Sequence, residues 1–166
     1  MNPGLSNAAA EQSDDRDFVL AAVKMSGVAI RYASERLRAD PEVALQAVRQ
    51  NGRALEFVAE TLRRDRKIVE AAVGQWAITL QFAAPELRDD RDIVLRAVRK
   101  WGVAVKYASE RLRADREIVL TAVKRNSAAL KYASRELRAE LKDGHPLVRQ
   151  LGTGAVTLSR AADEEG

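Results

Sequence analysis

A block of 25 residues recurs along this chain with no insertion or deletion between the copies. The five full copies begin at Asp15, Asp40, Asp65, Asp90 and Asp115. A sixth copy loses the pattern after Glu140. A unit this short cannot bury a hydrophobic core alone, so neighbouring copies must pack against one another in a row. The repeat therefore predicts a quasi-one-dimensional array that acts through its exposed surface.

The first half of each copy has the pattern of an amphipathic helix. Position one is always Asp, which can cap the free N–H groups of a helix start, and Pro41 suits a first helical turn. Apolar residues follow at positions four, five, eight and nine, which share one face of an α-helix. We expect this helix to end near position thirteen, with a glycine in the left-handed conformation at Gly27, Gly52 and Gly102.

The second half of each copy predicts a second helix. Apolar residues fall at positions fifteen, sixteen, nineteen and twenty-three, with an aromatic residue at eighteen. Ala at position eight and Leu at position twenty-three recur in every full copy, and we expect both sets to form ladders in the core. The predicted fold is all-α, an α-solenoid of five 25-residue helix-turn-helix repeats with a partial C-terminal cap.

The predicted boundaries follow the repeat. Residues 1–14 are expected to form a flexible N-terminal tail, residues 15–139 the solenoid, residues 140–151 the cap and residues 152–166 a flexible C-terminal tail. Four apolar residues suggest the cap: Leu141, Leu147, Val148 and Leu151. No comparable cap precedes Asp15, so we expect an open apolar surface at that end.

Composition narrows the cellular setting. The chain has no cysteine, which excludes disulfides and thiolate metal sites and fits a reducing compartment. Its first residues lack the basic and apolar regions of a signal peptide, and no stretch of 18 residues is free of charge. We therefore expect a cytoplasmic protein with no membrane partner.

Two segments carry a resemblance to a known family. The string DREIVLTAVKRNSAALKYASRELRA at residues 115–139 and its near copy at residues 90–114 resemble the helical repeats of domain of unknown function 4116. The resemblance implies an all-helical tandem array and carries over no catalytic or binding residue. The third copy, at residues 65–89, departs from this pattern most.

Positions ten and eleven hold six bases and no acid across the five copies. Stacking would align them as a basic row, and over residues 15–139 the 25 Lys and Arg exceed the 17 Asp and Glu by eight charges. Such a row can attract an acidic partner or a nucleic-acid backbone. Alternatively, the cations only complement helix C-termini. The candidate binding residues are Lys24, Arg49, Arg99, Lys100, Lys124 and Arg125.

The only two tryptophans, Trp76 and Trp101, share position twelve in consecutive copies. Stacked close together near the basic row, they would be an aromatic anchor for a peptide or a base. The alternative is a partly buried packing role.

The third copy also suggests a hinge. Glu70 replaces a Leu, Gly74 replaces a Lys or Arg, and Pro85 lies inside the predicted second helix, where proline should bend or shorten it. Ordinary divergence of a tolerant copy is the alternative.

An Arg follows the ladder Leu in every full copy. We expect it to pair, across neighbouring repeats, with the capping Asp two residues later or with carbonyls at helix ends, and a phosphate-binding ladder is the alternative. The residues are Arg38, Arg63, Arg88, Arg113 and Arg138.

No sequence motif for catalysis, a cofactor or a metal is present. We expect a non-enzymatic helical-repeat scaffold for a protein or peptide partner. A nucleic-acid-binding array is the first alternative, and a self-assembling structural module is the second. The chain would be a monomer or an end-to-end homo-oligomer.

Overall fold

The computed structural model describes residues 12–144, and every regular element in that part of the chain is a helix. The α-helices and 3₁₀ helices (labelled η) follow in this order: α2 (Arg16–Met25), η1 (Gly27–Tyr32), α3 (Glu35–Arg38), α4 (Pro41–Gln50), η2 (Gly52–Glu56), η3 (Glu60–Arg64), α5 (Arg66–Gln75), η4 (Ala77–Phe82), α6 (Pro85–Arg88), α7 (Arg91–Lys100), η5 (Gly102–Tyr107), α8 (Glu110–Arg113), α9 (Arg116–Arg125), η6 (Ser127–Tyr132) and α10 (Arg135–Gly144).

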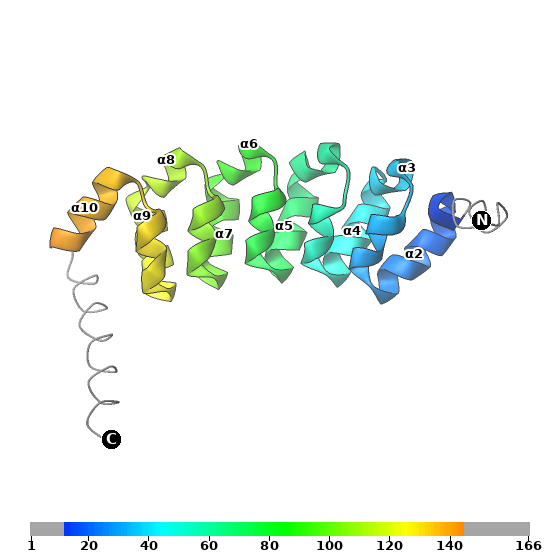
Figure 1. Ribbon diagram of the computed structural model, residues 1–166, viewed down its shortest axis with the longest axis horizontal. Coiled ribbons are helices and arrows are strands. Elements are labelled where there is room, and N and C mark those ends of the chain that lie inside the picture. The colour runs from blue at the N-terminus through cyan, green and yellow to red at the C-terminus, as the bar shows by residue number, and fades with distance from the viewer. Residues whose placement is uncertain (1–11, 145–166) are drawn as a thin grey trace, which may run out of the picture.

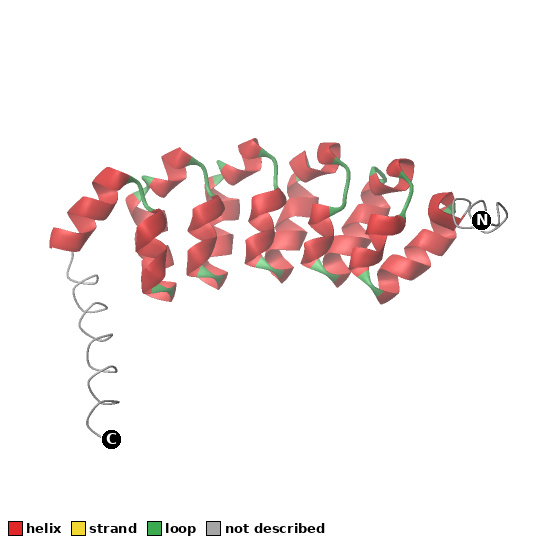
Figure 2. Cartoon of the chain, in the orientation of Figure 1, coloured by secondary structure: helices red, strands yellow, loops and turns green. Residues whose placement is uncertain are grey.

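Successive helical units lie side by side along the long axis of the molecule, and the short helices α3, α6 and α8 follow its upper edge (Figure 1). The connections between helices are short throughout the described residues (Figure 2). The helices α2, α4, α5, α7 and α9 each pack on the 3₁₀ helix of their own copy, and each of the first four also packs on the next of these helices along the chain. The result is two rows of helices, with the apolar side chains between them.

The Asp at position one caps the following α-helix in all five copies, as predicted. The Asp40 side chain, for example, accepts hydrogen bonds from the backbone N–H groups of Glu42 at 2.8 Å and Val43 at 3.1 Å. These donors have no partner within the helix, so the cap fixes the residue at which each α-helix begins.

The second half of the copy contains two helices rather than the single one predicted. In the first copy, η1 ends at Tyr32, Ala33 and Ser34 are extended, and a new helix begins at Glu35. The Ser34 hydroxyl caps this helix by accepting a hydrogen bond from the Leu37 N–H at 3.3 Å. A capping serine at position twenty recurs at Ser109 and Ser134. The apolar spacing alone did not reveal this break.

The predicted left-handed glycines are wrong, because no described residue has a positive φ. Position thirteen is instead a place of close contact between copies. A β-carbon on Gly52 would stand 2.5 Å from the carbonyl oxygen of Ala72 in the next copy, and one on Gly27 or Gly102 would stand 2.2 Å from the carbonyl oxygen of Ala47 or Ala122. Glycine is therefore required by the neighbouring copy and not by backbone conformation.

Pro85 does not lie inside a helix. It is the first residue of α6, at a position where an N–H group would have no partner within the helix. The prediction that this proline removes a hydrogen bond and bends a helix is therefore wrong, and the hinge proposed for it loses its physical basis.

A main-chain hydrogen bond joins each copy to the next at the upper edge. The N–H at position twenty donates to the carbonyl at position twenty-four of the preceding copy. The donor and acceptor pairs are Ala59 and Arg38 at 2.9 Å, Ala84 and Arg63 at 2.9 Å, Ser109 and Arg88 at 2.9 Å, and Ser134 and Arg113 at 2.8 Å. No side chain takes part, so the bond persists where the sequences of the copies differ.

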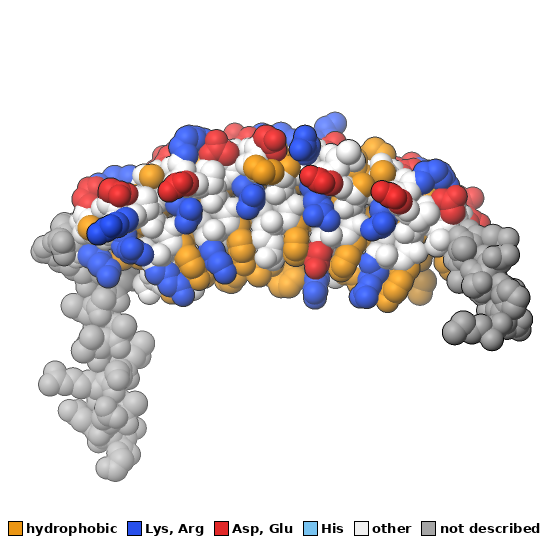
Figure 3. All heavy atoms as spheres, turned by 45° about the horizontal axis from the view of Figure 1, so that its top comes forward, with side chains coloured by type: hydrophobic (Ala, Val, Ile, Leu, Met, Phe, Trp, Pro, Cys, Tyr) orange, Lys and Arg blue, Asp and Glu red, His pale blue; other side chains and the backbone are white. Residues whose placement is uncertain are grey.

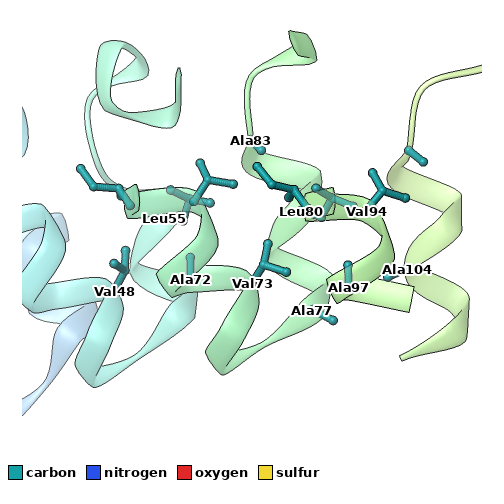
Figure 4. Packing of buried hydrophobic residues seen from close by; sticks show 14 of the residues in the cluster. Val48, Leu55, Ala72, Val73, Ala77, Leu80, Ala83, Val94, Ala97 and Ala104 are labelled. Atoms are coloured by element: carbon teal, nitrogen blue, oxygen red, sulfur yellow. The ribbon is translucent and has the colours of Figure 1, made fainter. Parts of the chain in front are cut away.

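The predicted core ladders are present. Four of the five ladder alanines are fully buried, with Ala22 partly exposed, and four of the five ladder leucines are buried, with Leu87 partly exposed. Figure 4 shows Val48, Ala72, Val73 and Ala97 in one continuous layer with Leu55 and Leu80. Apolar contact between copies therefore runs without interruption along the array.

Both predicted tail boundaries change. Gln12, Ser13 and Asp14 are helical, and the Ser13 carbonyl accepts the Ser34 N–H at 2.7 Å, as position twenty-four does in the full copies. These residues therefore act as the end of a preceding copy. At the other terminus, α10 continues through residue 140, where the cap was expected to begin, and its Leu141 is fully buried. Leu147, Val148 and Leu151 lie outside the described residues.

Candidate binding surface

Two adjoining grooves cross the exposed face of the long α-helices. The larger, of about 770 Å³, lies over α7 and α9, and the smaller, of about 480 Å³, lies over α4 and α5. Gly74 and Arg96 line both of them. We call the combined surface the basic groove.

Gly74 joins the two halves of the basic groove. Four other copies have Lys or Arg at this position, but here a β-carbon would have no atom within 4 Å. The glycine lies within α5 with an ordinary helical backbone. Its role is therefore to leave space open, in contrast to the glycines at position thirteen, where no space remains.

Most cations of the basic groove lack acidic partners in the described part of the chain. The side chains of five of these cations make no hydrogen bond or ion pair with any described residue: Arg49, Lys67, Arg96, Arg99 and Arg125. Three of these were predicted from the basic row, whereas Lys67 at position three and Arg96 at position seven were missed. Positions three, seven and ten share one face of the helix, so the helical period was the signal that could have identified them.

The carboxylates in the groove, in contrast, are already paired. Glu70 binds Arg66 at 2.8 Å, Asp92 lies 3.7 Å from the same guanidinium, and Glu117 binds Arg91. The unpaired charge in the groove is therefore positive, and an anionic ligand would meet cations that need not break existing ion pairs.

The Arg at position two provides these pairs, and it also bridges to the next copy. Arg16 contacts Asp40 at 3.1 Å and also Glu42, and Arg91 contacts Asp115 at 3.5 Å and also Glu117. The hydrogen bond that Arg16 donates to Glu42, and then the one it donates to Asp40, raise the pKa of Arg16 above its ordinary value. These arginines consolidate the junctions between copies and are not available to a ligand.

Lys67 is unpaired for a reason visible in the sequence. The second copy has Pro41 where the others have the bridging Arg, and the third copy has Lys67 where the others have an acid. The bridge is therefore absent at this junction, and the cation is left in the groove.

Lys100 belongs to the groove but has a structural contact. Its ammonium group donates to the carbonyl oxygen of Gly74 in the preceding copy. Gln50 at the equivalent position reaches back in the same way, with its amide donating to the Met25 carbonyl at 3.1 Å. At these two copies, position eleven therefore bonds to a carbonyl at the end of the preceding long helix. Lys24 and Lys124 are exposed and lie outside the groove.

Trp76 and Trp101 follow α5 and α7 directly and do not line the groove. They are 49% and 39% exposed. No ring contact joins the two indoles in the described part of the chain. The structure therefore does not bring the predicted aromatic pair together with the basic groove.

The three predicted hinge residues lie in two different places in the structure. Glu70 and Gly74 both line the basic groove, whereas Pro85 lies at the opposite end of its copy, in α6. The junction between the third and fourth copies differs from the others at another residue, Ala77, which stands at position thirteen in place of glycine. Its methyl group occupies the space between copies, and α5 and α7 contact each other less extensively than the other neighbouring long helices do.

The Arg at position twenty-four bonds to carbonyls of its own copy and makes no ion pair with the capping Asp. Arg63 donates to the carbonyls of Glu56 at 2.7 Å and Val58 at 3.3 Å, and Arg138 donates to that of Lys131 at 3.0 Å. Carbonyl groups are therefore the partners of these two residues, but they belong to the same copy and not to a neighbouring one as predicted. The Nε atoms of Arg38, Arg88 and Arg113 are buried without a partner. The side chains are directed inward, which leaves no basis for a phosphate-binding ladder.

Aromatic and cationic side chains alternate on the 3₁₀ helices. Lys106 lies 5.5 Å from the ring centre of Tyr107 and 5.9 Å from that of Tyr132 in the next copy. Arg31 bridges Tyr32 and Phe57 in the same way, at 4.9 and 5.7 Å. Figure 3 shows Lys and Arg side chains interspersed with hydrophobic ones along one face of the array. Here the cations have aromatic partners, whereas those of the basic groove have none.

Residues 12–144 contain no helix long and apolar enough to cross a membrane and no group of side chains suited to hold a metal ion. Their helices and grooves define a tandem helical-repeat protein with a charged face. The sequence profile described as Domain of unknown function (DUF4116) matches four overlapping segments: residues 15–63, 40–88, 65–113 and 90–138. The chain belongs to this family, and each match spans two of its 25-residue copies. No curated protein and no solved structure matches the chain.

Proposed function

We propose that this protein is an α-solenoid of five 25-residue repeats with a partial C-terminal cap, and that it acts as a non-enzymatic scaffold for a protein or peptide partner. The observation that carries the proposal is the basic groove, which crosses helices of four consecutive copies and contains cations with no partner in the described residues. Open faces of stacked repeats are surfaces on which helical-repeat proteins bind partners.

The floor of the groove favours a protein ligand. Leu95 is nearly buried, Leu45 is partly buried, and Ala71 lies between their helices. Apolar contact at the centre with charges around it is the usual composition of a protein interface. The proposed partner therefore contacts the floor with apolar side chains and the walls with polar ones.

A nucleic-acid backbone is the first alternative, and the unpaired cations are the observation that favours it. Self-assembly is the second. At the N-terminal end, Phe18 is 50% exposed, whereas its equivalents Ile68, Ile93 and Ile118 are at most 2% exposed. A pocket of about 230 Å³ lies beside it, lined by Phe18, Val19 and Tyr32 among others. A second copy of the array can cover this surface.

Selection of a random peptide library on the full chain tests the proposal. Enrichment of a peptide that binds saturably at one site, measured by calorimetry, is the expected result. The proposal fails if no peptide is enriched and the purified protein instead retains nucleic acid that salt releases. Concentration-dependent association without peptide binding would favour the self-assembling module.

The remaining expectations follow from the scaffold proposal. We place the protein in the cytoplasm, and assign it no catalytic residue and no cofactor. Incubation with metal ions and common cofactors, followed by thermal melting, checks the last point, since a bound cofactor raises the melting temperature.

A further inference from the structure

We propose that the basic groove takes an extended acidic peptide whose Glu or Asp residues alternate with aliphatic ones, and that Gly74 admits it. This inference rests on the proposed function and specifies the chemistry of its partner. It starts from the contrast between two sets of cations on the same helices.

At position two, every Arg is already bridged to an acid of the next copy: Arg16, Arg66, Arg91 and Arg116. Four groove cations at positions three, seven, ten and eleven form no ion pair with an acid in the described part of the chain: Lys67, Arg96, Arg99 and Arg125. The array thus neutralises its junctions internally and leaves the groove to be neutralised by another molecule. Charge complementarity of this kind selects an acidic partner.

The side chains that line the groove favour a peptide over a nucleic acid. Glu70, Asp92 and Glu117 also line the groove, between the cations. These carboxylates are already paired with arginines, whereas Leu45, Ala71 and Leu95 offer apolar contacts that peptide side chains can use and a phosphate chain cannot. None of the groove-lining residues is aromatic, so single-stranded bases would find no stacking partner there.

The dimensions fit an extended chain. Packed helices lie roughly 10 Å apart, so cations on α4 and α7 are separated by two helix spacings, or roughly 20 Å. An extended peptide advances about 3.3 Å per residue, so about six residues span this distance and about nine reach α9. Alternate side chains of such a peptide point to opposite sides, and one set would meet Leu45, Ala71 and Leu95.

Gly74 lies at the middle of this path. A Lys or Arg there, as in the other copies, would occupy the space shared by the two halves of the groove. The glycine opens the passage at the expense of helix stability, since glycine inside a helix is less favourable than alanine. The loss has no compensating contact, because a β-carbon would meet nothing.

The test uses a fluorescent peptide of about nine residues with alternating Glu and Leu, titrated against the full chain by anisotropy. A second peptide with Gln in place of Glu is the charge control. We expect the Glu peptide to bind at least about tenfold more tightly, because charge pairs across an interface are worth a kilocalorie or more.

Variants locate the site. Arg96→Glu should weaken binding by about tenfold, whereas Lys24→Glu, the same charge change on exposed α2 outside the groove, should alter it less than about twofold. Gly74→Leu should block the passage without lowering the melting temperature, and Gly74→Ala should retain binding. Equal effects of Arg96→Glu and Lys24→Glu, or full binding by Gly74→Leu, overturn the inference.

A single-stranded oligonucleotide that displaces the peptide and binds more tightly also overturns it. The two proposals fail separately. If the peptide library yields non-acidic ligands that Gly74→Leu does not affect, the scaffold proposal stands and the acidic groove is wrong. If it yields no ligand, the scaffold proposal itself is wrong.

Discussion

Gly52 lies so close to Ala72 of the next copy that a β-carbon on Gly52 would stand 2.5 Å from the Ala72 carbonyl oxygen. That carbonyl also accepts the Trp76 N–H at 2.9 Å, so it cannot move without disturbing the end of α5. Side-chain size at position thirteen therefore sets the distance between neighbouring copies.

Gly102→Ala should destabilise the array, because its methyl group would overlap the Ala122 carbonyl. Overpacking of this kind costs about 1–3 kcal/mol. Gly74→Ala is the matched control, and it should stabilise the protein by about 0.5–1 kcal/mol, since it adds a helix-favouring residue in open space. Chemical denaturation of both variants checks the pair. A Gly102→Ala variant as stable as the parent would show that the copies separate freely.

Ala77→Gly should tighten the junction between α5 and α7. With the methyl group removed, the third and fourth copies can approach as closely as the others do, and amide exchange in α5 and α7 should slow. Pro85→Glu, which restores the residue found at this position in three other copies, should leave exchange at the junction unchanged. The opposite pattern, with exchange sensitive to Pro85 and not to Ala77, would restore the hinge predicted at the proline.

Two partly buried carboxylates, those of Asp40 and Asp90, should make the protein less stable in acid. Burial alone raises the pKa of Asp40, but hydrogen bonds from the Val43 N–H, Arg16 and the Glu42 N–H bring that pKa below its ordinary value. The pKa of Asp90 is lowered in the same way, with Arg66 as the main donor against burial. The unfolded chain therefore binds more protons in acid. The stabilisation is present above an unfolded-state pKa of about 4 and is lost as the pH falls through the lower folded-state values.

Urea denaturation between neutral pH and pH 2, roughly the lower end of carboxyl titration, measures this loss. Asp90→Asn should be less stable at neutral pH and should lose less stability on acidification. Asp17→Asn is the control, because the Asp17 carboxylate is exposed and makes no ion pair in the described residues. A parent and an Asp90→Asn variant with parallel pH profiles would refute the assignment.

Trp76→Ala and Trp101→Ala should each cost stability but not affinity for the acidic peptide. The side chains are half buried, so a loss of about 1–2 kcal/mol is expected, less than for a fully buried aromatic residue. Neither lines the basic groove. Weakened peptide binding at an unchanged melting temperature would instead identify the tryptophans as the partner's anchor.

Much of the fold could be predicted because its determinants are local or repeated. The Asp caps act within three residues, and the Ala and Leu ladders recur at a fixed interval. The split of the second half could not be predicted from apolar spacing, since a 3₁₀ turn and an α-helical turn bury similar positions over so short a segment. Ser34, Ser109 and Ser134 carried the missing signal as potential caps.

The role of glycine at position thirteen was misjudged for a different reason. A sequence shows that a side chain is absent, but not whether the absence serves the residue's own backbone or a neighbour's. Gly52 yields space to Ala72, and Gly74 yields it to solvent in the groove. The basic row was predictable from composition, whereas its extension through Lys67 and Arg96 required knowing which helix face remains uncovered.

The bond from the Ala59 N–H to the Arg38 carbonyl, with its counterparts at each later copy, uses main-chain atoms alone. A duplicated copy would therefore form this bond to its neighbour whatever side chains it carries. Proline at position twenty is the exception, because it has no N–H group to donate. Lengthening such a chain by recombination requires no new interface to be invented, and a copy freed from that demand can specialise, as the third has around Gly74.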